Sequence, residues 1–129
     1  MDMLTSNTML MMEKSMDYLW AKQTAVLDNI SNAETPGYKT KFVTFEDTFR
    51  SRLASAMKES NPRESVREAL EQSKPILRVA KQDVKRMDGN GVNVTEQSVE
   101  LVRNGYQMQY VMEAINKNFS ILRTAIRGQ

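Results

Sequence analysis

Carboxylates are the only plentiful side chains in this chain that could support acid–base or metal chemistry. The 129 residues contain no histidine and no cysteine, so the commonest general base and the thiolate nucleophile are both missing. Serines therefore have no histidine to activate them. The adjacent Glu46 and Asp47 would point in different directions on a helix, where their charges suit a helix start. We expect a protein that is not an enzyme and holds no cofactor.

Residues 88–91 and 93–95 are two further places where a ligand or a modification could be sought. Asp88-Gly89-Asn90-Gly91 lacks the alternating oxygen ligands and the distal glutamate of a calcium loop, so its sequence favours a tight turn instead. Residues 93–95 fit a glycosylation sequon, a pattern that is common by chance. We expect no metal site.

The charge balance also bounds the partners. The net charge is only +2, with both signs spread along the chain, which argues against a basic patch for nucleic acid. The mildly basic part after residue 38 is interrupted by acids, and we interpret it as a solvated face that could contact an acidic partner. No run of about eighteen apolar residues occurs, and the acidic start of the chain lacks a basic region. We expect no transmembrane segment and no cleaved signal peptide.

Two stretches show the 3-4 alternation of apolar residues that is typical of a coiled-coil seam. The first predicts a helix over residues 9–33, interrupted only by Gln23, with a possible N-cap anywhere in residues 4–8. Its seam residues are Met9, Met12, Met16, Leu19, Val26, Ile30 and Ala33. Tyr18 and Trp20 lie beside this seam, so a second face could also be covered. An amphipathic helix of an ordinary bundle is the alternative.

The second stretch predicts a helix from about residue 95 to residue 127. Thr95 could be its N-cap, with Val94 and Val99 as a hydrophobic staple, or Asn93 could form a capping box with Glu96. Gly105 would let a neighbouring backbone approach closely. The seam residues are Leu101, Gly105, Met108, Met112, Ile115, Phe119, Leu122 and Ile126.

We therefore expect a mainly α fold in which the long N- and C-terminal helices pair as an antiparallel coiled coil. Residues 1–37 and 95–129 would form this coiled-coil domain, and residues 38–94 would form a small irregular middle segment. Two helices cannot bury both seams and their flanking apolar residues, and helices are stabilised mainly by packing. The surplus surface points to assembly with partner chains.

The middle segment carries weaker signals. Helical spacing of Phe42, Phe45, Phe49, Leu53 and Met57 predicts a helix, with Thr44 or Asp47 as its cap. Asn61 and Pro62 open a second, short and exposed helix that ends near residue 73. Residues 76–79 and 92–94 flank the turn at 88–91, so a β-hairpin is possible.

A helix stop and a forced turn occupy residues 29–39. Thr35 precedes a proline and is pushed towards an extended conformation, whereas Pro36 and Gly37 are in the order of a type II turn. Asn32 could cap the preceding helix, and Asn29 and Asn32 could bond to a partner helix or a neighbouring subunit. The motif residues are Asn29, Asn32, Thr35, Pro36, Gly37 and Tyr38.

The string from Asn29 to Lys39 resembles the signature near the N-terminus of flagellar rod, hook and hook-junction proteins. The turn at residues 88–96 and the closing residues 116–126 resemble the small proximal rod proteins of that family. The resemblance covers both terminal thirds well and the middle poorly. Gly91 is an insertion, and Gln97-Ser98 stand where a second acid is often found.

This resemblance implies a structural subunit of the bacterial flagellar rod that is exported by the flagellar type III apparatus without signal cleavage and crosses the periplasm. It implies other rod subunits, the rod–membrane-ring junction protein and the export gate as partners. It further implies terminal segments that fold on assembly, for which the underburied seams give a physical reason. Another small proximal rod subunit, and a soluble helical adaptor or secretion chaperone, remain alternatives.

Overall fold

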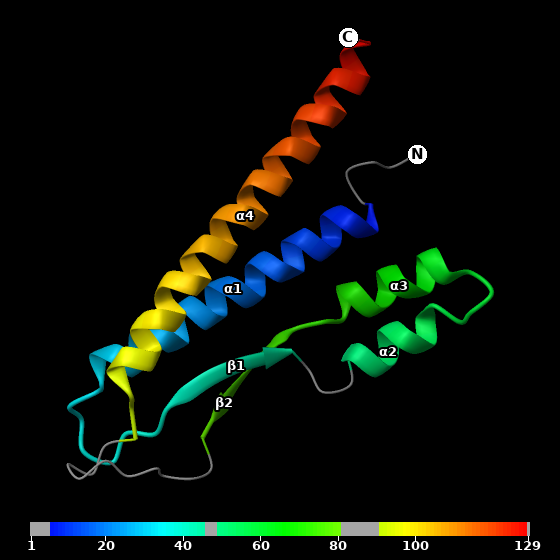
Figure 1. Cartoon of the computed structure of the whole chain (residues 1–129). Helices are drawn as coiled ribbons and strands as arrows, with labels where there is room; N and C mark the ends of the chain where they lie inside the picture. The colour runs from blue at the N-terminus through cyan, green and yellow to red at the C-terminus, as the bar shows by residue number, and fades with distance from the viewer. Residues whose placement is uncertain (1–5, 46–48, 81–90, 129) are drawn as a thin grey trace.

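The computed structural model describes residues 6–45, 49–80 and 91–128 (Figure 1). The chain is mainly helical, as the sequence predicts, and its two long helices run in opposite directions. Its elements in order are α1 (Asn7–Ser31), β1 (Lys41–Phe45), α2 (Phe49–Ala56), α3 (Pro62–Glu71), β2 (Pro75–Val79) and α4 (Val94–Arg127).

The antiparallel pairing of α1 and α4 is confirmed, and three contacts define its register. Asn29 Nδ2 lies 2.9 Å from Gln97 Oε1, at one end of the pair. Asn104 Nδ2 donates to Leu19 O at 2.9 Å, and Asn118 Nδ2 lies 3.4 Å from Met12 Sδ. The C-terminal end of α1 therefore lies beside the N-terminal end of α4, and the N-terminal part of α1 lies beside the later turns of α4.

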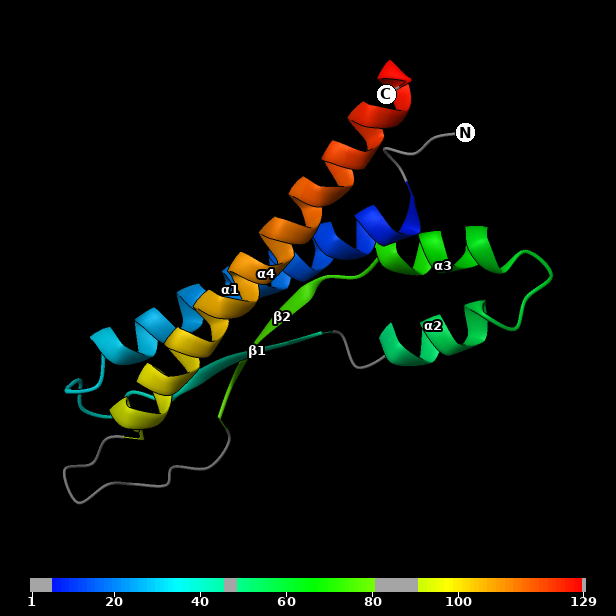
Figure 2. The same cartoon turned by 45° about the horizontal axis from the view of Figure 1, so that its top comes forward.

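The two helices separate towards the C-terminus, as both views show (Figures 1 and 2). With 34 residues, α4 is about 51 Å long, whereas α1 has 25 residues and spans about 37 Å. The last turns of α4 consequently extend beyond the part of α1 that could cover them.

Polar side chains define the helix starts. The Oγ of Ser6 accepts a hydrogen bond from the Met9 amide at 3.2 Å, which places the N-cap of α1 inside the expected interval. Asn93 Oδ1 accepts from the Glu96 amide at 3.2 Å, so Asn93 is the N-cap of α4. The alternative cap, Thr95, is wrong because it already lies within the helix.

The middle segment differs from its prediction in the first strand. Phe42 and Phe45 belong to β1 rather than to a helix, and the helix begins only at Phe49. Their spacing fits a helix, but β-branched and aromatic residues in succession favour a strand once a partner strand is present. That partner is β2, which pairs antiparallel with Lys41 opposite Val79. Thr44, one of the two expected caps of this helix, is wrong because it lies within β1. Asp47, the other expected cap, lies outside the described residues.

The expected hairpin is also wrong in its pairing. Strand β2 bonds to the earlier β1 and not to residues 92–94, because Asn93 begins the helical capping of α4 instead. The turn residues Asp88, Gly89 and Asn90 lie outside the described residues.

The core is small and lies where α1 meets its neighbours. Leu19, Val26, Val43, Leu70 and Val92 are among its buried members. Helix α3 is short, as expected, but it packs on α1: Asn7 Nδ2 donates to Arg63 O at 2.8 Å. Within the described ranges, no helix is both long enough and apolar enough to cross a membrane.

Candidate assembly interface

Asn29 joins three elements of the chain through one fully buried side chain. Its Nδ2 donates to Lys41 O at 2.7 Å and to Gln97 Oε1 at 2.9 Å. Its Oδ1 accepts from the Lys41 amide at 2.8 Å and from the Tyr38 hydroxyl at 3.3 Å. Both backbone groups of Lys41 are thus satisfied by one amide, as a neighbouring strand would satisfy them. Asn29 therefore bonds to the partner helix as well as to the strand.

The segment that follows has the expected turn geometry. The Tyr38 amide donates to Thr35 O at 3.2 Å, and Gly37 has φ +73°, the positive φ that a type II turn requires after Pro36. Asn32 is the C-cap of α1, and its Nδ2 donates a hydrogen bond to Asp28 O at 2.8 Å. Asn32 thus closes its own helix, whereas Asn29 connects it to others.

Tyr18 closes the same edge of β1 from one side of α1. Its hydroxyl donates to Val43 O at 3.2 Å, and its ring stacks on Phe45 with centroids 4.7 Å apart. Trp20, on the other side, is exposed. Of the two aromatic residues beside the α1 seam, Tyr18 is thus packed against β1, whereas Trp20 is 58% exposed.

The expected seam of α1 mostly faces the fold. Leu19, Val26 and Ala33 are buried, and the other four members are partly buried. On α4, by contrast, the eight seam residues fall into two sets at seven-residue spacing. One set is partly buried and shares a face with Asn104 and Asn118, which contact α1; it comprises Leu101, Met108, Ile115 and Leu122.

The other set on α4 comprises the partly buried Gly105 and three exposed side chains, and we call it the open stripe: Gly105, Met112, Phe119 and Ile126. The three side chains are 54%, 48% and 78% exposed. Apart from the adjacent residues and the backbone of α4 itself, no atom of the described residues lies within 4 Å of the position that a Cβ on Gly105 would take. The expectation that Gly105 admits a neighbouring backbone is therefore not met within this chain.

Amide side chains, and not members of the open stripe, occupy several positions of α4 that face α1. Gln97 and Asn104 are the buried polar residues of α4, and Asn118 continues the series. Sequence reasoning missed them because it followed apolar residues alone. Two signals were present: the spacing of 97, 104 and 118 by seven and then fourteen residues, and the interruption of the α1 seam at Gln23, whose Oε1 accepts from Asn104 Nδ2 at 2.7 Å.

The periodicity of both helices places the start of the open stripe, Gly105, on the side of the pair away from the sheet. Successive residues of α1 point in successive directions around its axis. Tyr18 faces β1, Leu19 contacts α4, and Trp20 lies beyond Leu19 on the side opposite Tyr18. On α4, Glu100 bonds to Lys22 on the side of the sheet, Asn104 contacts α1, and Gly105 lies beyond Asn104 on the other side. At 100° per residue, Trp20 and Gly105 thus lie on the same side, and each later member of the open stripe turns back by about 20° towards the face of Leu101.

An ion pair borders the opposite side of the interface. Lys22 Nζ lies 2.9 Å from Glu100 Oε2, and Arg103 lies 2.8 Å from Glu100 Oε1. The hydrogen bond from Lys22, assisted by the charges of Lys22 and Arg103, lowers the pKa of Glu100 below its usual value, although burial opposes this.

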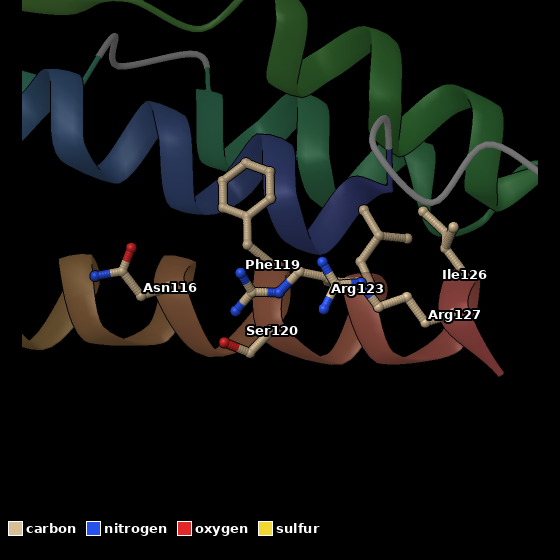
Figure 3. Close-up of a pocket in the computed structure, with 7 residues that line it drawn as sticks. Asn116, Phe119, Ser120, Arg123, Ile126 and Arg127 are labelled. Carbon is tan, nitrogen blue, oxygen red and sulfur yellow. The ribbon is translucent and has the colours of Figure 1, made fainter. Parts of the chain in front are cut away.

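A groove lies along the last turns of α4, where the open stripe ends (Figure 3). Phe119 and Ile126 project to the same side of the helix there. Its lining residues are Asn116, Phe119, Ser120, Leu122, Arg123, Ile126 and Arg127. The lining combines apolar side chains with two cations and carries no carboxylate among these residues. Across the described ranges, no cluster of acidic residues could hold a metal ion.

Two curated proteins are similar to this chain. The flagellar basal body rod protein FlgB of Bacillus subtilis (strain 168) is 27% identical over 132 residues, covering 97% of each protein. The similarity is to flagellar rod proteins. The protein of the same name from Buchnera aphidicola subsp. Baizongia pistaciae (strain Bp) is 24% identical over 115 residues, covering 83% of this chain and 85% of that protein. No protein-family model matches the chain.

The extent of the first alignment matters more than its identity. Because it spans nearly the whole of both proteins, it includes both terminal helices and the middle segment. The similarity therefore supports a relationship to flagellar basal-body rod proteins. Both names describe a rod protein, and neither describes an enzyme.

Proposed function

We propose that this chain is a structural subunit of the bacterial flagellar basal-body rod, at its proximal end. Its terminal helices assemble with neighbouring subunits into the drive shaft that transmits torque, and no chemical reaction is performed. The observation that carries the proposal is the open stripe: apolar side chains repeat every seven residues on a long helix and remain 48–78% exposed in their own chain. The similarity to two FlgB proteins supports the same reading.

The proposed assembly assigns different work to different parts of the chain. Residues 1–37 and 95–129 form the assembling coiled-coil part, and residues 38–94 form a middle segment that braces α1. The motif around Asn29 and Gly37 fixes the direction in which the chain leaves the helical layer. Neighbours that cover the stripe are other rod subunits; the rod–membrane-ring junction protein and the export gate are contacts at the base. The subunit reaches the periplasm-spanning rod by flagellar type III export, without a cleaved signal peptide.

Introducing a negative charge on the open stripe tests this function. Phe119→Glu and Met112→Glu place a carboxylate on exposed positions, so the isolated chain should stay soluble and helical. Burial of that charge against a neighbour should prevent assembly. We expect loss of swimming and loss of the subunit from purified basal bodies.

A matched control lies two residues away. Ile121 is also exposed, at 54%, but it projects from another side of α4. Ile121→Glu adds the same charge to the same turn, and we expect it to retain assembly. Normal swimming of both stripe variants would refute the proposed role of the stripe, and absence of the unmodified chain from purified basal bodies would refute the proposed function itself.

A further inference from the structure

The outer side of α1 carries two acids beside a tryptophan. Glu13, Asp17 and Trp20 are exposed, and at 100° per residue they fall within about 60° of one another around the helix. Leu19, which contacts α4, points about 100–160° away from them. Among the described residues, neither carboxylate has a hydrogen bond or an ion pair. We call these three residues the acidic face of α1.

The groove on α4 has the complementary chemistry (Figure 3). Arg123 and Arg127 line it together with Phe119 and Ile126. Both arginines are exposed, and no described residue pairs with either guanidinium. Arginine and carboxylate form strong charge-assisted hydrogen bonds. The groove therefore suits a helix that presents an apolar side chain beside carboxylates.

The acidic face and the groove cannot meet within one chain. Met12 and Asn118 are in contact, so Glu13 is about level with residue 117 in the antiparallel pair, and Asp17 with residue 113. The arginines at positions 127 and 123 lie ten residues further along α4, about 15 Å. The complement of each surface must therefore come from another molecule.

A second copy of the chain matches both charge pairs at once. The acids are four residues apart on α1, and the arginines are four residues apart on α4. When two such helices run antiparallel, a contact of Asp17 with Arg123 also sets Glu13 opposite Arg127. The equal spacing makes this a single register for both pairs.

The same register places Trp20 in the groove. Trp20 lies three residues from Asp17 on α1, and Ser120 lies three residues from Arg123 on α4, so the two are level. The small Ser120 side chain lines the groove and leaves room for the indole beside Phe119. Burial of an aromatic ring supplies affinity, whereas exposed ion pairs mainly select the partner and the register.

We propose that the acidic face of one copy docks antiparallel on the α4 groove of a second copy, with Asp17 opposite Arg123 and Glu13 opposite Arg127. Every copy carries both surfaces, so a second copy supplies the complement that one chain lacks within itself. This inference rests on the proposed function and names one neighbour of the subunit in the rod. It concerns assembled chains and holds whether the terminal helices pair before assembly or only during it.

Charge reversal on one surface or on both tests whether the partner is a second copy. Glu13→Arg with Asp17→Arg sets like charges against the arginines, and Arg123→Glu with Arg127→Glu sets like charges against the acids. Because like charges across an interface are strongly unfavourable, each double variant should lower the content of the subunit in purified basal bodies by about tenfold or more. The four-substitution variant again carries opposite charges on its two surfaces, so its content should recover to within about twofold of the unmodified chain. A different protein covering either surface would keep its own charges, and no recovery would follow.

Lys117→Glu is the matched control for Arg123→Glu. Lys117 is exposed on the same part of α4 but is turned by about 120° from Arg123. Arg123→Glu alone should lower the content in basal bodies by about threefold or more, whereas Lys117→Glu should leave it within about twofold. Equal losses would attribute the effect to net charge and would overturn the assignment of the groove.

Disulfide cross-linking identifies the neighbour directly. Thr24 lies seven residues from Asp17 on α1, and Asn116 lies seven residues from Arg123 on α4, so both are level in the same register. Thr24→Cys with Asn116→Cys leaves all four charges and Trp20 in place in a chain that has no native cysteine. Mild oxidation of basal bodies should yield disulfide-linked dimers or higher multiples of this chain, and neither single variant should do so.

The outcomes separate this inference from the proposed function. When the unmodified chain is present in basal bodies, an adduct with a different protein, or no adduct, would overturn the inference and leave the function standing. A four-substitution variant as defective as the double variants would overturn it as well. Absence of the unmodified chain from basal bodies would refute the function itself, and the inference would fall with it.

Discussion

The first and last parts of α4 share one helical geometry but differ in what covers them. From Gln97 to Asn104 the helix is bonded to α1 through buried amides and an ion pair. From Met112 to Ile126 it carries exposed apolar side chains, and the axes of the two helices separate (Figure 1). We call these the covered part and the open part of α4.

The difference teaches where this chain is specific and where it is incomplete. The covered part uses polar groups that need defined partners, because a buried amide without a partner is costly. The open part uses apolar surface, which stabilises in proportion to the area removed from water and tolerates several geometries. A helix with both is suited to pair with α1 through its first part and to bind neighbours along its remainder.

The largest expected effect breaks the covered part at Asn29. Asn29→Ala removes four hydrogen bonds and leaves both backbone groups of Lys41 unpaired, so we expect a loss of about 3 kcal/mol or more in the free energy of unfolding. Urea denaturation followed by circular dichroism measures it. Asn32→Ala is the control, since its partly buried side chain bonds, among the described residues, only to the nearby Asp28 and Thr35, and about 1 kcal/mol is expected. Equal losses would show that Asn29 is not the joint we describe.

Amide hydrogen exchange distinguishes the two parts directly. Residues 97–111 should exchange more slowly than residues 116–127 in the isolated chain, by about tenfold to a hundredfold, because the end of α4 opens without breaking the core. Uniform protection along the helix would contradict the division into a covered and an open part.

Gly105→Ala sharpens the comparison with a smaller effect of opposite sign. The site is helical and open, so alanine should stabilise the isolated chain by about 0.5–1 kcal/mol through helix propensity. Thermal denaturation measures the gain. If a neighbouring subunit packs on this glycine in the rod, the same variant should reduce incorporation into basal bodies. A destabilised isolated chain would show that the site is closed by the chain itself.

The smallest expected effect concerns the ion pair that borders the covered part. The pKa of Glu100 is lowered in the folded chain, so its contribution to stability is present above the unfolded pKa near 4.5 and disappears as the pH falls through the lower folded pKa. The side chain is partly exposed, which limits this contribution to about 0.2–1 kcal/mol. Denaturation of Glu100→Gln between pH 6 and pH 3 should show a shallower pH dependence, and an unchanged slope would contradict the assignment.

The sequence predicted the two long helices, their pairing and the turn at Pro36 because each depends on local or periodic information. Helical periodicity gave α1 and α4, and the order of Pro36 and Gly37 gave the turn. The strand β1 was missed because the three-residue spacing of Phe42 and Phe45 fits a helix, and only pairing with β2, which begins 30 residues after the end of β1, favours the strand. Long-range pairing of this kind leaves no mark in a local window.

The pattern of apolar residues also could not predict that the α4 seam divides into a set that faces α1 and a more exposed set. Leu101 and Gly105 look equivalent in the sequence, yet only one of their two sets lies beside the amides that contact α1. Polar residues at seven-residue spacing carry the missing information, because a buried amide marks the covered side more sharply than another leucine does. A reading that followed Gln97, Asn104 and Asn118 together with Gln23 would have oriented the helix.

The most direct test of the account is whether the open stripe becomes covered in the rod. Met112→Cys supplies a single thiol to this cysteine-free chain, and maleimide labelling is compared for the isolated chain, native basal bodies and denatured basal bodies. The account predicts rapid labelling of the isolated chain and of denatured basal bodies, and strong protection in native ones. Equally rapid labelling in native and denatured basal bodies would contradict it.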